Sequence, residues 1–496
     1  MANGVAEPVA QSPGTQKRPF SMRDKIGYMF GDFGNDFTFI LQMMFFMLFY
    51  TNVVGIQPAH VGLLFLVARV VDGFTDVFAG IIIDRLPLSK QGTKFKHWIK
   101  YGAVPVAISS ALMYMAFVAD WESYTLRVVY MAATYVLWGS VTYTVVNIPY
   151  GSMASVISSD PDHRAQLSVF RSTGANLAML VIQAALPLVV YVERDGVSVL
   201  DGQRMSIAAD VCAALAVVCY MICFANVEER VLPPAKDPNE KAPGIGAMLS
   251  SVFSNRALLT LILGALLLLL GNLFLSGMLG YIFLSYFNNG ALQSIAAMAA
   301  LLPTFILVVL APWLGKRFGK AETGTIAMLA AGTVLLVAYF LKTTNPVLWI
   351  VLYAIASFGV AVFNFLVWAF ITDVIDFQDV RTGHRDDATV YALYSWSRKA
   401  GQALAGGLTG AALQAIGFSV EAAQAGQTQS TEVLDGLYFL VNVVPGVCFV
   451  LVGLVLGFLY PLKKSVIDKN VKILAARRAG TRLDEDPLAG RQGQSV

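Results

Sequence analysis

Long uninterrupted apolar runs constrain this chain more than any other feature. The run from Leu258 to Leu270, for example, contains no charged residue. A stretch of roughly 20 apolar residues crosses the hydrocarbon core of a bilayer as a helix, whereas a membrane barrel shows strands of about ten residues with alternating polarity. The whole chain is 56% hydrophobic and 14% charged, too apolar for a soluble domain. We therefore predict an all-α polytopic membrane protein.

Short polar segments divide the apolar sequence into about twelve predicted helices. Their ranges are 25–51, 58–84, 98–119, 124–153, 165–192, 205–225, 256–287, 291–314, 322–342, 346–377, 388–417 and 433–461. The longest connection follows the sixth helix, so we expect two six-helix halves, 25–225 and 256–461, joined by a cytoplasmic central loop, 226–255. The first twenty residues lack the apolar core of a signal peptide. We expect a disordered cytoplasmic tail at 1–24 and a cytoplasmic C-terminal tail at 462–496.

Lysine and arginine gather in alternate connections, which predicts the orientation. Arg85 and Lys94 belong to a basic connection, whereas the opposite set holds little more than Arg127 and Lys342. Cytoplasmic loops carry the basic excess, so both termini are expected in the cytoplasm of a bacterial cell, with the helices in its inner membrane among lipid. The net charge of +3 is spread over many loops and gives no reason to expect nucleic acid as a partner.

The second predicted helix carries three ionisable residues on one stripe. Arg69, Asp72 and Asp76 are spaced by three and four residues, and charged residues inside a membrane helix usually mark an ion or substrate path. Two carboxylates one turn apart can hold a small cation or share a proton. Thr75 could add a hydroxyl ligand for sodium. The alternative is that Arg69 neutralises one aspartate while the other reaches the membrane interface.

The first and fourth predicted helices add groups suited to a sugar. Asp36 lies deeper in the first span than Asp32, and a carboxylate can orient sugar hydroxyls in a mostly apolar cavity. On the fourth helix, Asn147 offers a hydrogen-bond donor and an acceptor. Tyr143 and Tyr150 offer flat faces and hydroxyls. Ordinary packing is an equally open interpretation of the two tyrosines.

The tenth and eleventh helices supply charges from the second half. Lys399 is too deep in the eleventh helix to reach the surface easily, so we expect it to pair with the aspartates of the second helix or with substrate. Asp373, Asp376 and Arg381 at the end of the tenth helix suggest a cytoplasmic ion-pair gate. A solvated helix end remains the alternative for these three.

The chain offers little for catalysis. Its histidines, His60, His97, His163 and His384, are single loop residues, and its four cysteines lie within apolar stretches without metal-ligand spacing. We expect no enzyme activity, no cofactor and no metal beyond a possible sodium ion at Asp72 and Asp76.

Several motifs in the same order along the chain resemble one known family. They are Phe49-Tyr50-Thr51-Asn52-Val53-Val54-Gly55, Leu66-Val67-Ala68-Arg69-Val70-Val71-Asp72-Gly73-Phe74-Thr75-Asp76, Asn147-Ile148-Pro149-Tyr150-Gly151, Phe170-Arg171 and Ser397-Arg398-Lys399-Ala400-Gly401-Gln402. From about residue 25 to residue 461 the sequence is similar to the melibiose permease-like glycoside-pentoside-hexuronide:cation symporters of the major facilitator superfamily. This resemblance implies two six-helix halves that rock around a central site.

The resemblance also implies residue roles. Asp72 and Asp76 match the family's cation-site carboxylates, Asp36 matches its sugar-binding acid, Lys399 matches a lysine that links the second half to the cation site, and Arg171 matches an arginine associated with sugar binding and closure. Two departures stand out: the fourth-helix aspartate and tryptophan of the melibiose carriers are replaced by Asn147 and Gly151. These replacements argue against an α-galactoside preference.

The expected function is therefore the symport of a sugar glycoside, pentoside or hexuronide with a proton or sodium ion, by alternating access and as a monomer. The missing fourth-helix acid favours the proton slightly, because fewer oxygen ligands remain for sodium. An uncoupled facilitator, or a carrier of another small organic solute on the same fold, is the main alternative, and a polytopic membrane enzyme is a remote one.

Overall fold

The computed structural model describes residues 17–87, 89, 92–231, 255–382, 387–478, 481, 483, 486 and 487. The N-terminal half consists of α1 (Met22–Phe49) with the π turn η1 (Tyr50–Val54), α2 (Pro58–Arg85), α3 (Lys96–Leu112) with η2 (Ala116–Asp120), α4 (Tyr124–Val136) continuing through η3 (Leu137–Tyr143) into α5 (Thr144–Ile157), α6 (Pro161–Val190) and α7 (Gly202–Asn226). A hairpin of β1 (Tyr191–Arg194) and β2 (Val197–Leu200) separates α6 from α7, with Tyr191 opposite Leu200.

The C-terminal half repeats this plan. It consists of α9 (Arg256–Tyr281) with η4 (Ile282–Tyr286), α10 (Leu292–Phe318), α11 (Lys320–Leu341), α12 (Pro346–Thr382), α13 (Asp387–Ala415), the short α14 (Val420–Gln424), and α15 (Thr431–Leu454) with η5 (Val455–Leu459). Helix α16 (Lys464–Arg478) follows. Counting the continuous α4–η3–α5 as one, the described residues form six long helices in each half, which confirms the predicted architecture.

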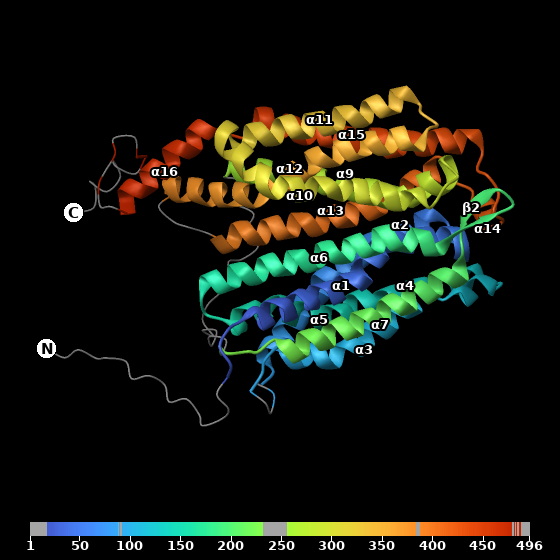
Figure 1. Cartoon of the computed structure of the whole chain (residues 1–496), viewed down its shortest axis with the longest axis horizontal. Helices are drawn as coiled ribbons and strands as arrows, with labels where there is room; N and C mark the ends of the chain where they lie inside the picture. The colour runs from blue at the N-terminus through green and yellow to red at the C-terminus, as the bar shows by residue number, and fades with distance from the viewer. Residues whose placement is uncertain are drawn as a thin grey trace.

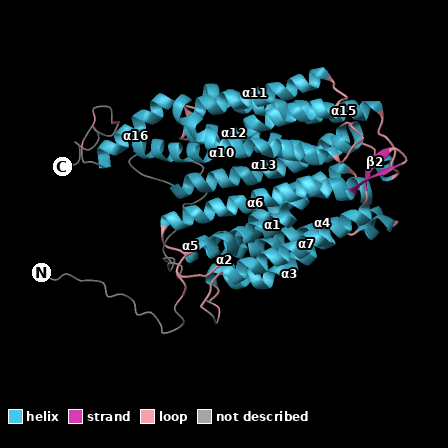
Figure 2. Ribbon diagram, viewed as in Figure 1, coloured by secondary structure: helices cyan, strands magenta, loops and turns pink. Residues whose placement is uncertain are grey.

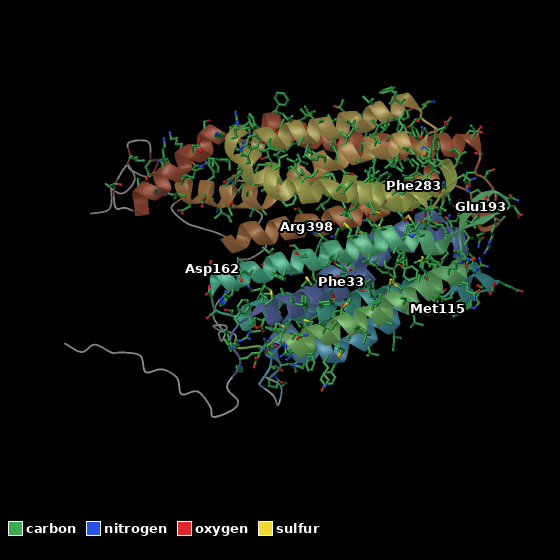
Figure 3. The ribbon with its side chains drawn as sticks, in the orientation of Figure 1. Phe33, Met115, Asp162, Glu193, Phe283 and Arg398 are labelled. Atoms are coloured by element: carbon green, nitrogen blue, oxygen red, sulfur yellow. The ribbon has the colours of Figure 1, made fainter. Side chains whose placement is uncertain are left out.

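The long helices lie side by side in two adjacent bundles, the N-terminal half in blue to green and the C-terminal half in yellow to red (Figure 1). Figure 2 shows the β hairpin at one end of the bundles and α16 at the other. We call these the hairpin end and the α16 end. Asp162, at the start of α6, and Glu193, in the hairpin, mark the two ends in Figure 3.

The outer faces of the helices are apolar, as a bilayer requires. Nine of the helical segments in the described residues have the length and hydropathy of a membrane span. Helix α2 shows the principle: Leu63, Val67, Val70, Phe74 and Phe78 are 53–65% exposed along one side, while its charged stripe faces the bundle interior. Such apolar exposure is stable in lipid and unstable in water.

The predicted boundaries of the tails and central loop need correction at their inner edges. Helix α1 begins at Met22, because Ser21 and Asp24 form a capping box. Arg18 and Arg230 both bind the fully buried Asp24, with N–O distances of 2.9 and 3.0 Å. Residues 17–24 and 227–231 therefore pack on the N-terminal half rather than forming free tail and loop.

Similar corrections apply beyond these segments. Asn226 completes α7, and α16 occupies residues 464–478 of the predicted C-terminal tail. Glu229, just after α7, accepts hydrogen bonds from the backbone N–H groups of Lys94, Phe95 and Lys96 at 2.5–2.8 Å, which caps the start of α3. The rest of the tail and loop predictions, including residues 1–16 and 232–254, falls outside the described residues.

Hydrogen bonds join the two halves at the hairpin end. The hydroxyls of Thr51 and Tyr281 are 2.8 Å apart, and the Tyr191 hydroxyl donates to Gln293 Oε1 at 2.8 Å. The Gln424 side chain donates to the backbone oxygen of Val53 at 2.9 Å. The halves are thus held together at this end.

Helices α2 and α13 also meet closely toward the hairpin end. A methyl group placed on Gly410 of α13 would come within 2.3 Å of the Pro58 backbone oxygen on α2. A methyl group on Gly406 or Gly407 would likewise come within 2.7 or 2.5 Å of the Phe65 and Leu66 side chains of α2. Small residues allow this helix contact, which closes the hairpin end of the space between the halves.

Candidate substrate and cation site

Midway along the bundle, the two acids of α2 each have partners. Asp72 Oδ2 lies 3.3 Å from the Arg69 guanidinium, and its Oδ1 accepts a hydrogen bond from Ser140 at 2.5 Å. Asp76 Oδ1 accepts a hydrogen bond from Thr144 at 3.0 Å. The stripe predicted on this helix therefore forms one connected polar cluster with the fourth membrane segment.

The π turn η3 brings the hydroxyl donors to this cluster. Ser140 lies within η3 and Thr144 follows it, so the wide turn rotates both toward α2. Gly139 lies beside the cluster, where a methyl group would make only an ordinary van der Waals contact, 3.8 Å from Asp72 Oδ1. Sequence reasoning missed Ser140 and Thr144, although their four-residue spacing, followed by Asn147 three residues later, is a helical stripe.

The second half enters this cluster through Lys399. The Lys399 ammonium on α13 lies 2.6 Å from Asp76 Oδ2. This is one of the two pairings predicted for Lys399. The lysine side chain is 53% exposed and Asp76 is 27% exposed, so this ion pair borders an open space rather than a sealed core.

Thr75 lies next to the cluster without facing it. Its hydroxyl donates to the backbone oxygen of Asp72 at 3.3 Å. In this conformation Thr75 does not complete a set of oxygen ligands around Asp72 and Asp76.

A second polar cluster lies nearer the α16 end, on α1 and α6. Arg171 of α6 binds Asp32 Oδ1 at 3.1 Å and is 41% exposed. Asp36, one turn further along α1, is partly exposed and has no hydrogen bond or ion pair to any residue that the structure describes. Asp32 and Asp36 thus differ: one acid is neutralised and the other is available to a ligand.

Asn147 belongs to a hydrogen-bond network behind Asp36. Asn35 donates to Asn147 Oδ1 at 2.8 Å and to the Tyr143 hydroxyl at 3.2 Å. Tyr220 of α7 donates to Asn35 Oδ1 at 2.8 Å. Three membrane segments of the N-terminal half, α1, α4–η3–α5 and α7, therefore fix the orientation of Asn147. Asn35 and Tyr220 were not predicted, because only the fold brings α7 to α1.

Tyr150 is a packing residue in this conformation. It is fully buried, its hydroxyl donates to the Tyr28 backbone oxygen at 2.7 Å, and the two rings stack at 4.7 Å. The Arg171 guanidinium lies 5.3 Å from the centre of the Tyr150 ring. Tyr150 thus supports Arg171 instead of facing the open space, in line with the packing interpretation left open for it.

The predicted gate residues lie at the α16 end, within the C-terminal half. Asp373 binds Lys320 at 2.7 Å, and the Arg381 guanidinium lies 5.4 Å from the Phe377 ring. Asp376 sits between them on α12 and also has an interaction partner. The Asp373–Lys320 pair links α12 to α11 and does not join the two halves in this conformation.

The two halves are therefore arranged asymmetrically along their length. Among the described residues, the cross-half hydrogen bonds other than the Lys399–Asp76 pair lie at the hairpin end, whereas farther along the bundle the side chains of Arg171 and Lys399 are 41% and 53% exposed. In the part of the chain that the structure describes, the two halves are therefore in contact at the hairpin end, and the charged side chains farther along the bundle are accessible.

Comparison with known proteins places the chain in a family. Residues 27–464 match the family model described as "MFS/sugar transport protein". The chain belongs to this family. It is a multi-pass membrane transporter of the major facilitator type, not an enzyme, and the predicted resemblance is confirmed.

Several relatives align with most of this chain and with most of their own length. An uncharacterized symporter of Bacillus subtilis, YjmB, is 32% identical over 90% of this chain and 94% of its own length. A glucuronide carrier protein homolog of Escherichia coli is 30% identical over 91% and 94%, and the isoprimeverose transporter of Lactiplantibacillus pentosus is 31% identical over 84% and 86%. A bacterial homologue of the iron transporter ferroportin has the same fold, with a TM-score of 0.61, 14% identity, and coverage of 89% and 100%.

Proposed function

We propose that this transporter carries a sugar glycoside, pentoside or hexuronide into a bacterial cell by symport with a proton or sodium ion. The observation that carries the proposal is the 2.6 Å ion pair between Lys399 and Asp76, because it links an intramembrane acid cluster to the opposite half. The glucuronide and isoprimeverose carriers among the relatives support a sugar substrate.

The charge balance of the central site supports coupling to one monovalent cation. Arg69, Lys399 and Arg171 each bind one acid, namely Asp72, Asp76 and Asp32, which leaves the carboxylate of Asp36 in excess. Moving uncompensated charge through a low-dielectric region is costly. A bound cation elsewhere in the site would bring the net charge of these groups to zero and so favour the closed, loaded carrier.

We place the cation at Asp72 and Asp76. A proton or a sodium ion on Asp76 would compete with Lys399, which would loosen the tie between the halves. The proton is the better candidate, because Ser140, Thr144, Arg69 and Lys399 already occupy the carboxylate oxygens and the Thr75 hydroxyl faces its own backbone.

We place the sugar between Asp36, Asn147 and Arg171. The free carboxylate of Asp36 can accept hydrogen bonds from two neighbouring hydroxyls, and Asn147 is held in one orientation by Asn35. Arg171 could exchange its bond with Asp32 for a substrate oxygen. Binding of sugar and cation would then each raise the affinity for the other, as coupling requires.

The basic loops lie at the α16 end, so we place this end in the cytoplasm and the hairpin end outside. The conformation described is then one with access from the cytoplasm. In the opposite conformation Asp373, Asp376 and Arg381 would be positioned to contact the N-terminal half as a cytoplasmic gate.

The test is transport into proteoliposomes with a panel of glycosides, pentosides and hexuronides, with imposed proton or sodium gradients. Wild-type protein should accumulate one sugar only when a cation gradient is present. Asp76→Asn should retain sugar exchange and lose accumulation. Uptake indifferent to both cations and to Asp76→Asn would contradict coupling and indicate a facilitator.

A further inference from the structure

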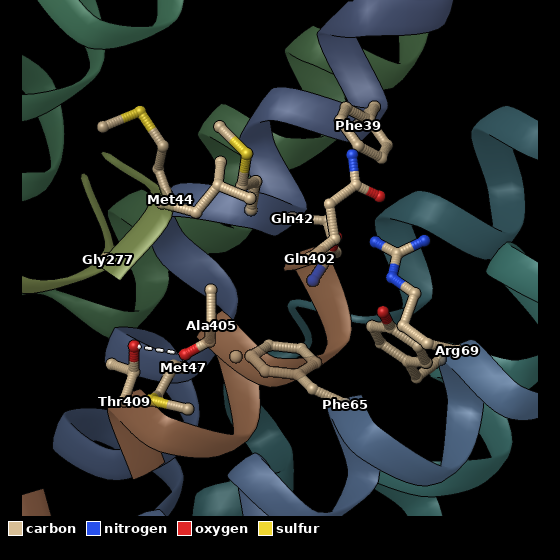
Figure 4. Close-up of a pocket in the computed structure, with 14 residues that line it drawn as sticks. Phe39, Gln42, Met44, Met47, Phe65, Arg69, Gly277, Gln402, Ala405 and Thr409 are labelled. Atoms are coloured by element: carbon tan, nitrogen blue, oxygen red, sulfur yellow. Dashed lines mark hydrogen bonds between the residues drawn. The ribbon is translucent and has the colours of Figure 1, made fainter. Parts of the chain in front are cut away.

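A wide groove lies on the outer face of the C-terminal half, among α10, α11 and α12, which Figure 1 draws in yellow to orange. Its volume is about 910 Å³. The pocket between the two halves beside Arg69 (Figure 4) measures only about 60 Å³, which is room for a few water molecules. The groove is thus much the larger space, and it shares no lining residue with the central site.

The groove is apolar over most of its length. Leu302 and Ile306 of α10 and Ile326 of α11 line it and are 58–70% exposed. Glu322 and Thr323, near the start of α11, are the polar side chains among its described lining residues. A groove of this kind on the outer face of membrane helices meets hydrocarbon rather than water. An acyl chain is the ligand that matches its walls.

Positive charge is found where the groove reaches the α16 end. The Arg317 guanidinium lies 5.5 Å from the ring centre of Phe318, which lines the groove, and 5.4 Å from that of Trp313. Arg317 is exposed, and its guanidinium has no hydrogen bond or ion pair to any residue that the structure describes. Aromatic rings at the end of a membrane helix lie at the level of the lipid head groups. Arg317 is therefore available to a head group.

Helix α16 fixes a second cation at the same turn. The Lys464 ammonium donates to the Arg317 backbone oxygen at 2.8 Å, and the Lys464 backbone N–H donates to Glu322 Oε1 at 3.2 Å. An ammonium has three donors, so Lys464 can also bind a ligand. Lys320 is already neutralised by Asp373. Arg317, Lys464 and Glu322 together leave one positive charge, which matches the single negative charge of a phosphodiester.

The length of the groove fits a lipid of one leaflet. Ala330 lines the groove eight residues after Glu322, about 12 Å along the axis of α11. Half of the hydrocarbon core of a bilayer is about 15 Å thick. An acyl chain that starts at the head-group level beside Glu322 therefore passes Ala330 before it reaches the middle of the membrane.

We propose that this groove binds one anionic phospholipid, phosphatidylglycerol, with its phosphate at Arg317 and Lys464 and one acyl chain along Ala330. A zwitterionic lipid fits less well, because its own ammonium offsets the phosphate charge. Glu322 is not open to that ammonium, since Lys464 binds one of its carboxylate oxygens and the other is buried. The lipid site does not depend on which solute or cation the carrier transports.

The experiment is native mass spectrometry of the full-length protein in detergent, titrated with phosphatidylglycerol, phosphatidylethanolamine or phosphatidylcholine of identical acyl chains. Wild-type protein should bind the first phosphatidylglycerol about tenfold more tightly than the other two lipids, the factor expected of one charge-assisted contact. Arg317→Gln should remove most of this preference. Ala330→Phe, which fills the groove, should weaken the binding of all three lipids several-fold.

Two variants outside the groove are the matched controls. Lys100→Gln also removes an exposed cation beside aromatic rings, those of Tyr101 and Phe224. Ala214→Phe also enlarges an exposed alanine of a membrane helix, here α7. Both should leave the lipid affinities within about twofold of wild type, as expected of surface substitutions away from the site.

Equal affinity of wild-type protein for the three lipids would overturn the proposal. So would an equal loss of preference in Arg317→Gln and Lys100→Gln, because the charge effect would then be diffuse, or equal behaviour of Ala330→Phe and Ala214→Phe. A protein dimer that Ala330→Phe disrupts would assign the groove to a second copy of the chain instead. The titration uses no sugar and no cation gradient, so its outcome is independent of the proposed symport.

Discussion

The two halves have similar helices but contribute unequally to the central site. The N-terminal half holds both acid clusters, on α1 and α2, together with two of their basic partners on α2 and α6. From the C-terminal half, α13 contributes Lys399, while another acid of that half, Asp373, is paired with Lys320 near the α16 end. This difference suggests that the N-terminal half binds the solutes and that binding affects the C-terminal half through the Lys399–Asp76 ion pair.

The largest effect should come from the free acid of the N-terminal half. Asp36→Ala should lower sugar affinity by about 100-fold, because charge-assisted hydrogen bonds to the unpaired carboxylate would be lost. Asp36→Asn, which keeps one acceptor, should lose about tenfold. Counterflow competition measures both. Near wild-type affinity in Asp36→Ala would show that the sugar binds elsewhere.

Breaking the Lys399–Asp76 ion pair between the halves should have the second-largest effect on transport. Lys399→Gln leaves Asp76 with an uncompensated charge and should slow exchange by about tenfold or more. Adding Asp76→Asn should restore exchange but not accumulation, since the two residues form one interacting pair. Exchange rates of both single variants and the double variant measure this coupling. A double variant no better than Lys399→Gln would argue against the pair as the link.

The contact between the halves at the hairpin end can be weakened separately. Gly410→Ala should push α13 away from Pro58 on α2, at a cost of about 1–3 kcal/mol to the conformation described. Labelling of an Asn52→Cys reporter at this end should rise several-fold.

The control for this experiment is Gly73→Ala, also on α2. A methyl group there meets no atom within 4 Å, so labelling should not change. The cysteines of the native chain, Cys212, Cys219, Cys223 and Cys448, are buried and should not react. Equal labelling in Gly410→Ala and Gly73→Ala would mean that this contact does not hold the closed end.

The smallest effects compare two hydroxyls beside the acid cluster. Ser140→Ala removes the 2.5 Å hydrogen bond to Asp72 and should change cation affinity by about three- to tenfold. Thr75→Val removes a hydroxyl that faces its own helix backbone and should change cation affinity by less than about twofold. Cation-dependent sugar binding measures both. A large loss of sodium dependence in Thr75→Val would indicate a rearranged sodium site that includes Thr75.

Much of the architecture could be predicted because membrane insertion depends on local sequence. The predicted helix 58–84 and the observed α2, Pro58–Arg85, differ by one residue at the end, since the apolar run and its polar borders are contiguous in the chain. The least accurate boundaries were those of the tails, where Arg18 and α16 depend on partners distant in sequence rather than on hydropathy.

For the site, the sequence by itself determined which side chains are costly enough in a membrane to require partners: Asp36, Arg69, Asp72, Asp76 and Lys399. Only the tertiary structure decided which partner each one has. Asp32 pairs with Arg171, 139 residues away, and Thr144 reaches Asp76 through a π turn. Burial cost is a property of the residue and its helix, whereas pairing depends on how each helix is rotated about its axis and packed against the others.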